Sequence, residues 1–148
     1  MVKKTELEAA FRATTYRVFL PGGSCDLRAG VASEALRCWL ETAGVGEFAI
    51  LTAHNPGAER GDEEENAARQ SQLECDLLAA GFEPYAGENV AADGGWPDEE
   101  TCFVPGIALA EAVALAAKYG QSAIIHGGND GLPGIVWLET AAVDAATA

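Results

Sequence analysis

Hydrophobic residues recur along the chain at two spacings, and these spacings predict helices interleaved with strands. Apolar positions three to four residues apart predict helices at 3–13, 33–44, 62–80 and 109–119. Short apolar or alternating runs predict strands at 15–20, 25–29, 48–53, 82–90, 101–105, 122–126 and 134–139. Hairpins therefore mix with helical crossovers, which is typical of an α+β fold. We expect a single domain over residues 1–148, with a mixed β-sheet, about four helices packed on it, and a small-residue tail at 140–148.

The clearest strand runs from Phe48 to Ala53. Its first four residues are all apolar, so neither face of the strand is suited to water, and we expect it in the interior of the sheet. The strand ends in polar residues and is followed by the turn Asn55-Pro56. Ligands often bind where a strand gives way to a loop. The pattern therefore indicates where a site would lie, without indicating its chemistry.

The helix at 62–80 places polar residues on its inward face. Its apolar stripe through Leu73 and Leu77 passes, when extended backwards, through Asn66, Arg69 and Gln70. These positions lie at the end of the helix nearest the Asn55-Pro56 turn. Buried amides and a guanidinium need hydrogen-bond partners, which could be one another or a ligand. The sequence leaves open a structural network that fixes the loop to the helix and a ligand site.

Arg69 is the side chain best suited to bind a carboxylate or phosphate through two hydrogen bonds. Glu99 or Glu100, just before the predicted strand at 101–105, could instead be its ion-pair partner. An anionic ligand becomes improbable if a carboxylate already neutralises Arg69.

Catalytic and metal-binding motifs are weak in this chain. His54 and His126 are the only histidines, and they could form an acid–base pair only if the fold brings them together. The four cysteines contain no Cys-x-x-Cys pair, so we expect free, buried thiols at positions 25, 38, 75 and 102. The glycine-rich stretch 127–131 is more typical of a hairpin turn than of a phosphate loop. The acidic run 62–65 is explained by helix capping. We therefore predict no metal and no cofactor.

Composition narrows the set of partners. The chain has 9 basic and 23 acidic residues and a formal net charge of −14, which repels nucleic acids and anionic membranes. No apolar run is long enough to span a bilayer. Glu6 and Glu8 lie where a signal peptide would need its apolar region, so we expect a cytoplasmic protein. The sequence does not determine the oligomeric state.

An ordered set of short motifs resembles one bacterial family. The set consists of FAILTAHNP at 48–56, Asn66-x-x-Arg69, the stretch from Trp96 to Phe103, and Gly120-Gln121 followed by Ala123-Ile124-Ile125. It resembles the domain of unknown function 3293 (DUF3293) over about residues 16–139. The resemblance implies a compact cytoplasmic protein without an assigned activity. The positions to which it points are Thr52, Asn55, Pro56, Asn66, Arg69, Glu99 and Gln121.

Two functions remain open. In the first, the protein binds a polar small molecule, an anion among the options, in a pocket at the junction after the 48–53 strand. The ligand-binding residues would be Thr52, Asn55, Asn66, Arg69, Glu99 and Gln121. If a reaction occurs, Glu99 or His54 would be the general base. In the second, the protein is a non-enzymatic interaction or regulatory module for a basic protein partner, and the polar cluster is purely structural. A pocket lined by the cluster would favour the first function, and a closed hydrogen-bond network the second.

Overall fold

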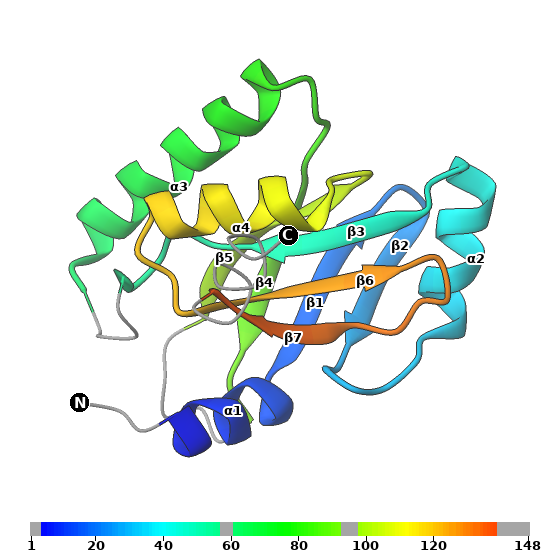
Figure 1. The fold of residues 1–148 in the computed structure, drawn as a ribbon, viewed down its shortest axis with the longest axis horizontal. Coiled ribbons are helices and arrows are strands. Elements are labelled where there is room, and N and C mark those ends of the chain that lie inside the picture. Colours follow the sequence, from blue (N-terminus) through cyan, green and yellow to red (C-terminus); the bar gives the residue numbers. More distant parts are fainter. Residues whose placement is uncertain (1–3, 57–60, 93–97, 139–148) are drawn as a thin grey trace.

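The structure is a computed structural model that describes residues 4–56, 61–92 and 98–138. Along the chain these form α1 (Lys4–Ala13), β1 (Thr15–Leu20), β2 (Gly23–Leu27), α2 (Glu34–Ala43), β3 (Glu47–Leu51), α3 (Glu63–Ala79), β4 (Tyr85–Val90), β5 (Glu99–Pro105), α4 (Leu109–Lys118), β6 (Ala123–Gly128) and β7 (Gly134–Trp137). The α+β class is confirmed, with boundaries within a few residues of those expected (Figure 1). The predicted tail at 140–148 and residues 93–97 of the β4–β5 loop lie outside the described residues.

The strands form one sheet in the order β2-β1-β4-β5-β3-β6-β7. Every neighbouring pair is antiparallel, so the expectation of a mixed sheet is wrong. The reason is that each helical crossover joins two strands of the same direction that are not neighbours. For example, α4 connects β5 to β6, and β3 lies between these two strands and is antiparallel to both.

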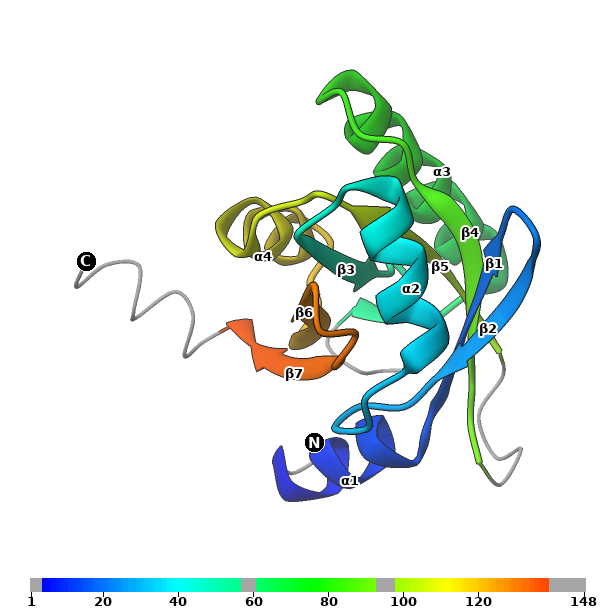
Figure 2. The same ribbon diagram turned by 90° about the vertical axis from the view of Figure 1, so that its right-hand side faces the viewer.

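β3 lies in the interior of the sheet, as its apolar run predicts. It pairs with β5 on one side and β6 on the other, and Phe48, Ala49, Ile50 and Leu51 are all buried. Helices cover both faces of the sheet (Figure 2). Ala49 and Leu51 pack with residues of α3 and α4, whereas Phe48 and Ile50 pack with residues of α2.

The N-terminal end of α3 lies close to the end of β3. Asp62 caps the helix by accepting a hydrogen bond of 3.1 Å from the backbone N–H of Glu65, which is the expected capping arrangement. Leu73 and Leu77 are buried in the core, as the apolar stripe predicts. Asn66 and Gln70 are also buried, at 5% and 1% exposure. In its first two turns, α3 therefore directs polar side chains toward the end of β3.

Candidate functional site

Two asparagine side chains bind each other where β3 gives way to α3. The Asn55 backbone N–H donates to Asn66 Oδ1 at 2.9 Å, and Asn66 Nδ2 donates to Asn55 Oδ1 at 2.9 Å. Asn55 Oδ1 also accepts from the backbone N–H of Gly61 at 2.8 Å. This reciprocal pairing fixes the loop to the first turn of α3.

Arg69 completes this network from the next turn of the helix. Its Nε donates to the Ala53 carbonyl at 3.1 Å and its Nη2 to Asn66 Oδ1 at 2.5 Å. Its Nη1 lies 3.9 Å from the exposed carboxylate of Glu65. The Arg69 side chain is 28% exposed, so the prediction of a largely buried, hydrogen-bonded guanidinium is confirmed.

Further hydrogen bonds hold the chain between β3 and Asn55. Gln70 Oε1 accepts from the Ala53 backbone N–H at 2.9 Å, and Gln70 Nε2 contacts Cys102 Sγ at 3.6 Å. Thr52 Oγ1 donates to the Glu100 carbonyl at 2.8 Å and accepts from the His54 backbone N–H at 3.1 Å. The loop is thus held from α3 on one side and from β5 on the other.

Glu99 and Gln121 reach the same place from distant parts of the sequence. Asn55 Nδ2 donates to Glu99 Oε2, and Gln121 Nε2 donates to the His54 carbonyl at 2.9 Å. The residues predicted to converge are therefore joined directly or through the loop at 52–55, and we call this set the junction cluster: Thr52, Asn55, Asn66, Arg69, Glu99 and Gln121. Their convergence is confirmed, whereas a role of each in ligand binding remains a prediction.

Many polar atoms of the junction cluster already form hydrogen bonds within the protein. The side-chain oxygens and nitrogens of Asn55 and Asn66 all have protein partners. Burial of these two amides therefore needs no ligand to explain it.

His54 differs from its neighbours because its Nε2 is buried and has no hydrogen-bond partner among the described residues. Burial lowers the pKa of the imidazole, and Arg69 acts in the same direction. Glu99 and Glu100 oppose this shift without reversing it. His54 is therefore neutral near pH 7, the protonation state that a general base requires.

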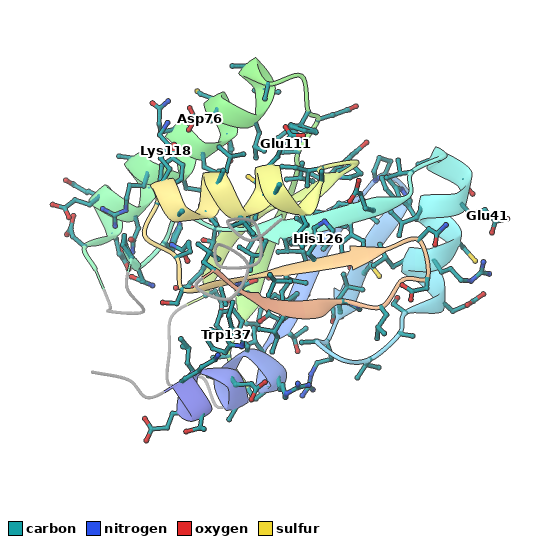
Figure 3. All side chains as sticks on the ribbon, viewed as in Figure 1. Glu41, Asp76, Glu111, Lys118, His126 and Trp137 are labelled. Atoms are coloured by element: carbon teal, nitrogen blue, oxygen red, sulfur yellow. The ribbon has the colours of Figure 1, made fainter. Side chains whose placement is uncertain are left out.

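The two histidines lie far apart. His126 is opposite Ala49 in the β3–β6 pairing, and its Nε2 lies 3.1 Å from the Ile107 carbonyl and 3.6 Å from Glu47 Oε1 (Figure 3). Ala49 precedes His54 by five positions, which corresponds to roughly 17 Å along an extended chain. The structure therefore gives no acid–base pair of His54 and His126.

The structure adds two polar side chains that sequence reasoning missed. Thr101 is only 3% exposed, and its Oγ1 has no hydrogen-bond partner among the described residues. The same holds for the buried Oδ1 of Asn89. Asn89 lies opposite Glu99 in the β4–β5 pairing, and Thr101 is two residues along the same strand from Glu99. A strand register would have been needed to find these neighbours from the sequence.

Other features lie away from this end of the sheet. A groove with a volume of about 640 Å³ lies between the end of α2 and the β6–β7 turn, and no residue of the junction cluster lines it. The four cysteines are free. Burial is as expected for Cys102, whose pKa it raises to about 12, but Cys38 and Cys75 are exposed because they lie on outward faces of their helices. Within the described residues, no three His, Cys, Asp or Glu side chains are grouped as metal ligands would be.

The fold and the junction cluster define a small α+β protein with a polar centre at one end of an antiparallel sheet. The family described as protein of unknown function (DUF3293) matches residues 51–124, half of the chain, and the chain therefore belongs to that family. The match includes the whole junction cluster. No curated protein and no solved structure matches the chain. In the part of the chain that the structure describes, no helix has the length and apolar character needed to cross a membrane.

Proposed function

We propose that this protein binds a small polar molecule at the end of the sheet where β3 ends and β5 begins. The observation that supports the proposal is a group of buried polar atoms around Glu99. His54 Nε2, Thr101 Oγ1 and Asn89 Oδ1 have no hydrogen-bond partner among the described residues. Most buried polar atoms in proteins do have partners, and a bound ligand would supply them here.

In this proposal, most residues of the junction cluster hold other residues in position, and one residue contacts the ligand. Asn66 and Arg69 hold the backbone and amide of Asn55, which in turn holds the Glu99 carboxylate. Thr52 and Gln121 hold the backbone of His54. Glu99 is then the member of the cluster that contacts the ligand, and Glu99 or His54 would act as base if a reaction follows. Arg69 would favour an anionic ligand, and Glu99 a cation or hydrogen-bond donor.

A second candidate is a non-enzymatic interaction or regulatory module with a basic protein partner. The mutual hydrogen bonding of Asn55, Asn66 and Arg69 favours this function, because a closed network can be purely structural. The net charge of −14 would attract such a partner.

Thermal denaturation of the purified protein with a panel of small metabolites distinguishes these functions. A ligand at a hundredfold excess over its Kd stabilises the folded state by about 2.7 kcal/mol, which is readily measured. We expect at least one compound to raise the melting temperature of the parent and of the control Glu111→Gln, an exposed position on α4, but not of Glu99→Gln. A panel without any stabilising compound, or full stabilisation of Glu99→Gln, would contradict the proposal and favour the interaction module.

A further inference from the structure

The groove between the end of α2 and the β6–β7 turn is formed by two separate parts of the chain. Residues between 37 and 46 supply one wall, Asn129 and Asp130 supply the other, and the volume is about 640 Å³. The Ser33 backbone N–H, at the start of α2, donates to the Gly131 carbonyl of the turn at 2.9 Å. Figure 1 shows this turn beside α2. The relative position of the two walls is therefore fixed by the fold.

Two glycines beside the groove are not explained by the protein's own structure. A Cβ atom at Gly46 would have no neighbouring atom within 4 Å, and the nearest atom to a Cβ at Gly128 would be the Gly46 carbonyl oxygen at 3.8 Å. Neither glycine has a positive φ. Packing and backbone conformation would therefore both accept a side chain at these positions. Glycine at such a position often marks a place where a ligand or another backbone approaches closely.

The lining of the groove combines apolar residues with carboxylates. Leu40 and Val45 form the apolar part, and Val45 is only partly buried against the core. Glu41 and Asp130 line the groove, one from each wall. The C-terminal end of α2, which Gly44 closes, adds negative partial charge. This combination suits a basic side chain, whose stem lies along apolar surface while its charged group meets carboxylates.

Arg37 also lines the groove, but carboxylates already compensate its charge. Its Nε and Nη2 donate to the carboxylate of Glu34 at 2.9 and 2.5 Å, and its Nη1 donates to Glu41 Oε2 at 3.1 Å. Asp130 accepts from the Leu132 backbone N–H at 3.1 Å and forms no ion pair among the described residues. Glu34, Glu41 and Asp130 therefore bring three carboxylates to one guanidinium.

Two basic residues, Lys3 and Arg60, lie outside the described ranges, but their sequence neighbours are far from the groove. Lys4 lies over the ring of Trp137, at the end of β7 away from the turn, and Gly61 is bonded into the junction cluster. The six-residue strand β6 separates that end of the sheet from the groove by roughly 20 Å. Among the described basic residues, only Arg37 lines the groove, so the excess of carboxylates there is not offset by another.

We propose that this groove docks a lysine or arginine side chain of a partner protein. The ammonium or guanidinium group binds Glu41 and Asp130, its stem lies on Val45, and the partner's backbone approaches Gly46 and Gly128. The site is separate from the junction cluster, so it goes beyond small-molecule binding and does not depend on it. It gives a definite location to a basic partner that the net charge alone would attract to any part of the surface.

Two-dimensional amide NMR of the full chain, titrated with blocked tripeptides, tests the proposal. The probes are Gly-Lys-Gly, Gly-Arg-Gly and the neutral Gly-Gln-Gly, and butylamine serves as a free amine without a peptide backbone. We expect the two basic peptides to shift the amide signals of residues 40–46 and 128–130 in a saturable way. Gly-Gln-Gly should be inactive, and butylamine should bind more weakly than Gly-Lys-Gly.

Matched variants separate docking in the groove from general attraction to an acidic protein. Asp130→Asn keeps an oxygen for Leu132 but should weaken binding of Gly-Lys-Gly about fivefold through the lost charge. Glu111→Gln removes the same charge at an exposed position on α4 and should bind as the parent does. Gly46→Ala and Gly46→Val should weaken binding progressively while the protein stays folded. Ala35→Val, at an exposed position on α2, should leave binding unchanged.

Five results would overturn the proposal. Shifts spread over the whole surface, with Asp130→Asn binding as the parent does, would mean that net charge alone attracts the peptides. Equal binding of Gly-Gln-Gly would mean that charge is not recognised. Unchanged binding by folded Gly46→Val would mean that the peptides dock elsewhere. Butylamine binding as tightly as Gly-Lys-Gly would indicate a site for small amines. The absence of a saturable shift with either basic peptide would mean that no such site exists, without bearing on the junction cluster.

Discussion

Asn55 adopts the left-handed backbone conformation, with φ of 49°, and among the described residues it is the one non-glycine residue with positive φ. Alanine and glycine at this position lose the same side-chain hydrogen bonds, but only alanine is strained by the conformation. We predict that Asn55→Ala is less stable than Asn55→Gly by roughly 1 kcal/mol, since strain at positive φ outweighs the entropy cost of glycine. Urea denaturation of both variants checks the order, and an Asn55→Ala variant as stable as Asn55→Gly would contradict it.

Arg69 links strand and helix through two hydrogen bonds. Its removal leaves the Ala53 carbonyl and Asn66 Oδ1 without these donors. We predict that Arg69→Ala lowers the free energy of unfolding by about 1–3 kcal/mol. Arg12→Ala, which removes an exposed guanidinium that pairs with Glu8 on the same helix, should change it by less than about 0.5 kcal/mol. Chemical denaturation measures the free energy of unfolding of both variants. If the two variants are equally stable, the structural role of Arg69 is contradicted.

Helical periodicity could predict which polar residues point inward, but not which residues face them. The stripe through Leu73 and Leu77 correctly indicated Asn66, Arg69 and Gln70, because position along one helix determines the face. Asn89 and Thr101 were not predicted, because the grouping of Asn89, Glu99 and Thr101 depends on the register between β4 and β5. Register is a property of a pair of strands, and one strand alone carries no signal for it.

At the scale of elements, Asp76 joins α3 to α4. Its Oδ2 accepts hydrogen bonds from Lys118 Nζ at 2.8 Å and from Tyr119 Oη at 2.5 Å (Figure 3). The bond from Lys118, followed by those from Tyr119 and Gln72, lowers the pKa of Asp76 to about 2 from its usual 3.8. A lowered pKa stabilises the folded state above pH 3.8, and this contribution disappears as the pH falls through about 2.

The prediction for Asp76 is a pH-dependent loss of stability. Asp76→Asn should melt below the parent at pH 7, and the difference between the two melting temperatures should shrink as the pH falls from about 4 toward 2. Glu111→Gln serves as the control on α4 and should show a small difference from the parent at pH 7. A difference between parent and Asp76→Asn that stays constant over this range would mean that the charge of Asp76 contributes nothing.

Two adjacent glycines of β6 differ in how closely their surroundings are packed, so they serve as a test variant and its control. A Cβ at Gly127 would lie 2.6 Å from two ring atoms of Phe48 and from the Leu132 carbonyl, whereas the nearest atom to a Cβ at Gly128 is 3.8 Å away. We predict that Gly127→Ala destabilises the protein by about 1–3 kcal/mol through overpacking. Gly128→Ala should change stability by less than about 0.5 kcal/mol. Denaturation curves of the two variants that coincide would show that Phe48 can move aside.

At the scale of the whole molecule, the apolar run Phe48–Leu51 correctly predicted a strand in the interior of the sheet, but the directions of the strands could not be predicted from the sequence. Four consecutive apolar residues need cover on both faces, which only an interior strand receives. Helical crossovers usually suggest parallel neighbours, and this suggested the mixed sheet. Here at least one other strand, such as β5 between β3 and β4, separates the strands that a crossover joins. Only the complete set of pairings reveals that all neighbours are antiparallel.

The net charge leads to a prediction for the molecule as a whole. Nine basic residues cannot neutralise 23 acidic ones, so carboxylates repel one another in the folded state whatever ion pairs form. Raising the NaCl concentration from about 0.01 M to about 0.15 M shortens the Debye length from about 30 Å to about 8 Å. We therefore expect the melting temperature at pH 7 to rise over this range. The same titration near the isoelectric point of about 4.3 is the control, where the rise should vanish because the net charge does. A melting temperature that falls with salt at pH 7 would mean that screened ion pairs such as Arg17–Glu88 outweigh the repulsion.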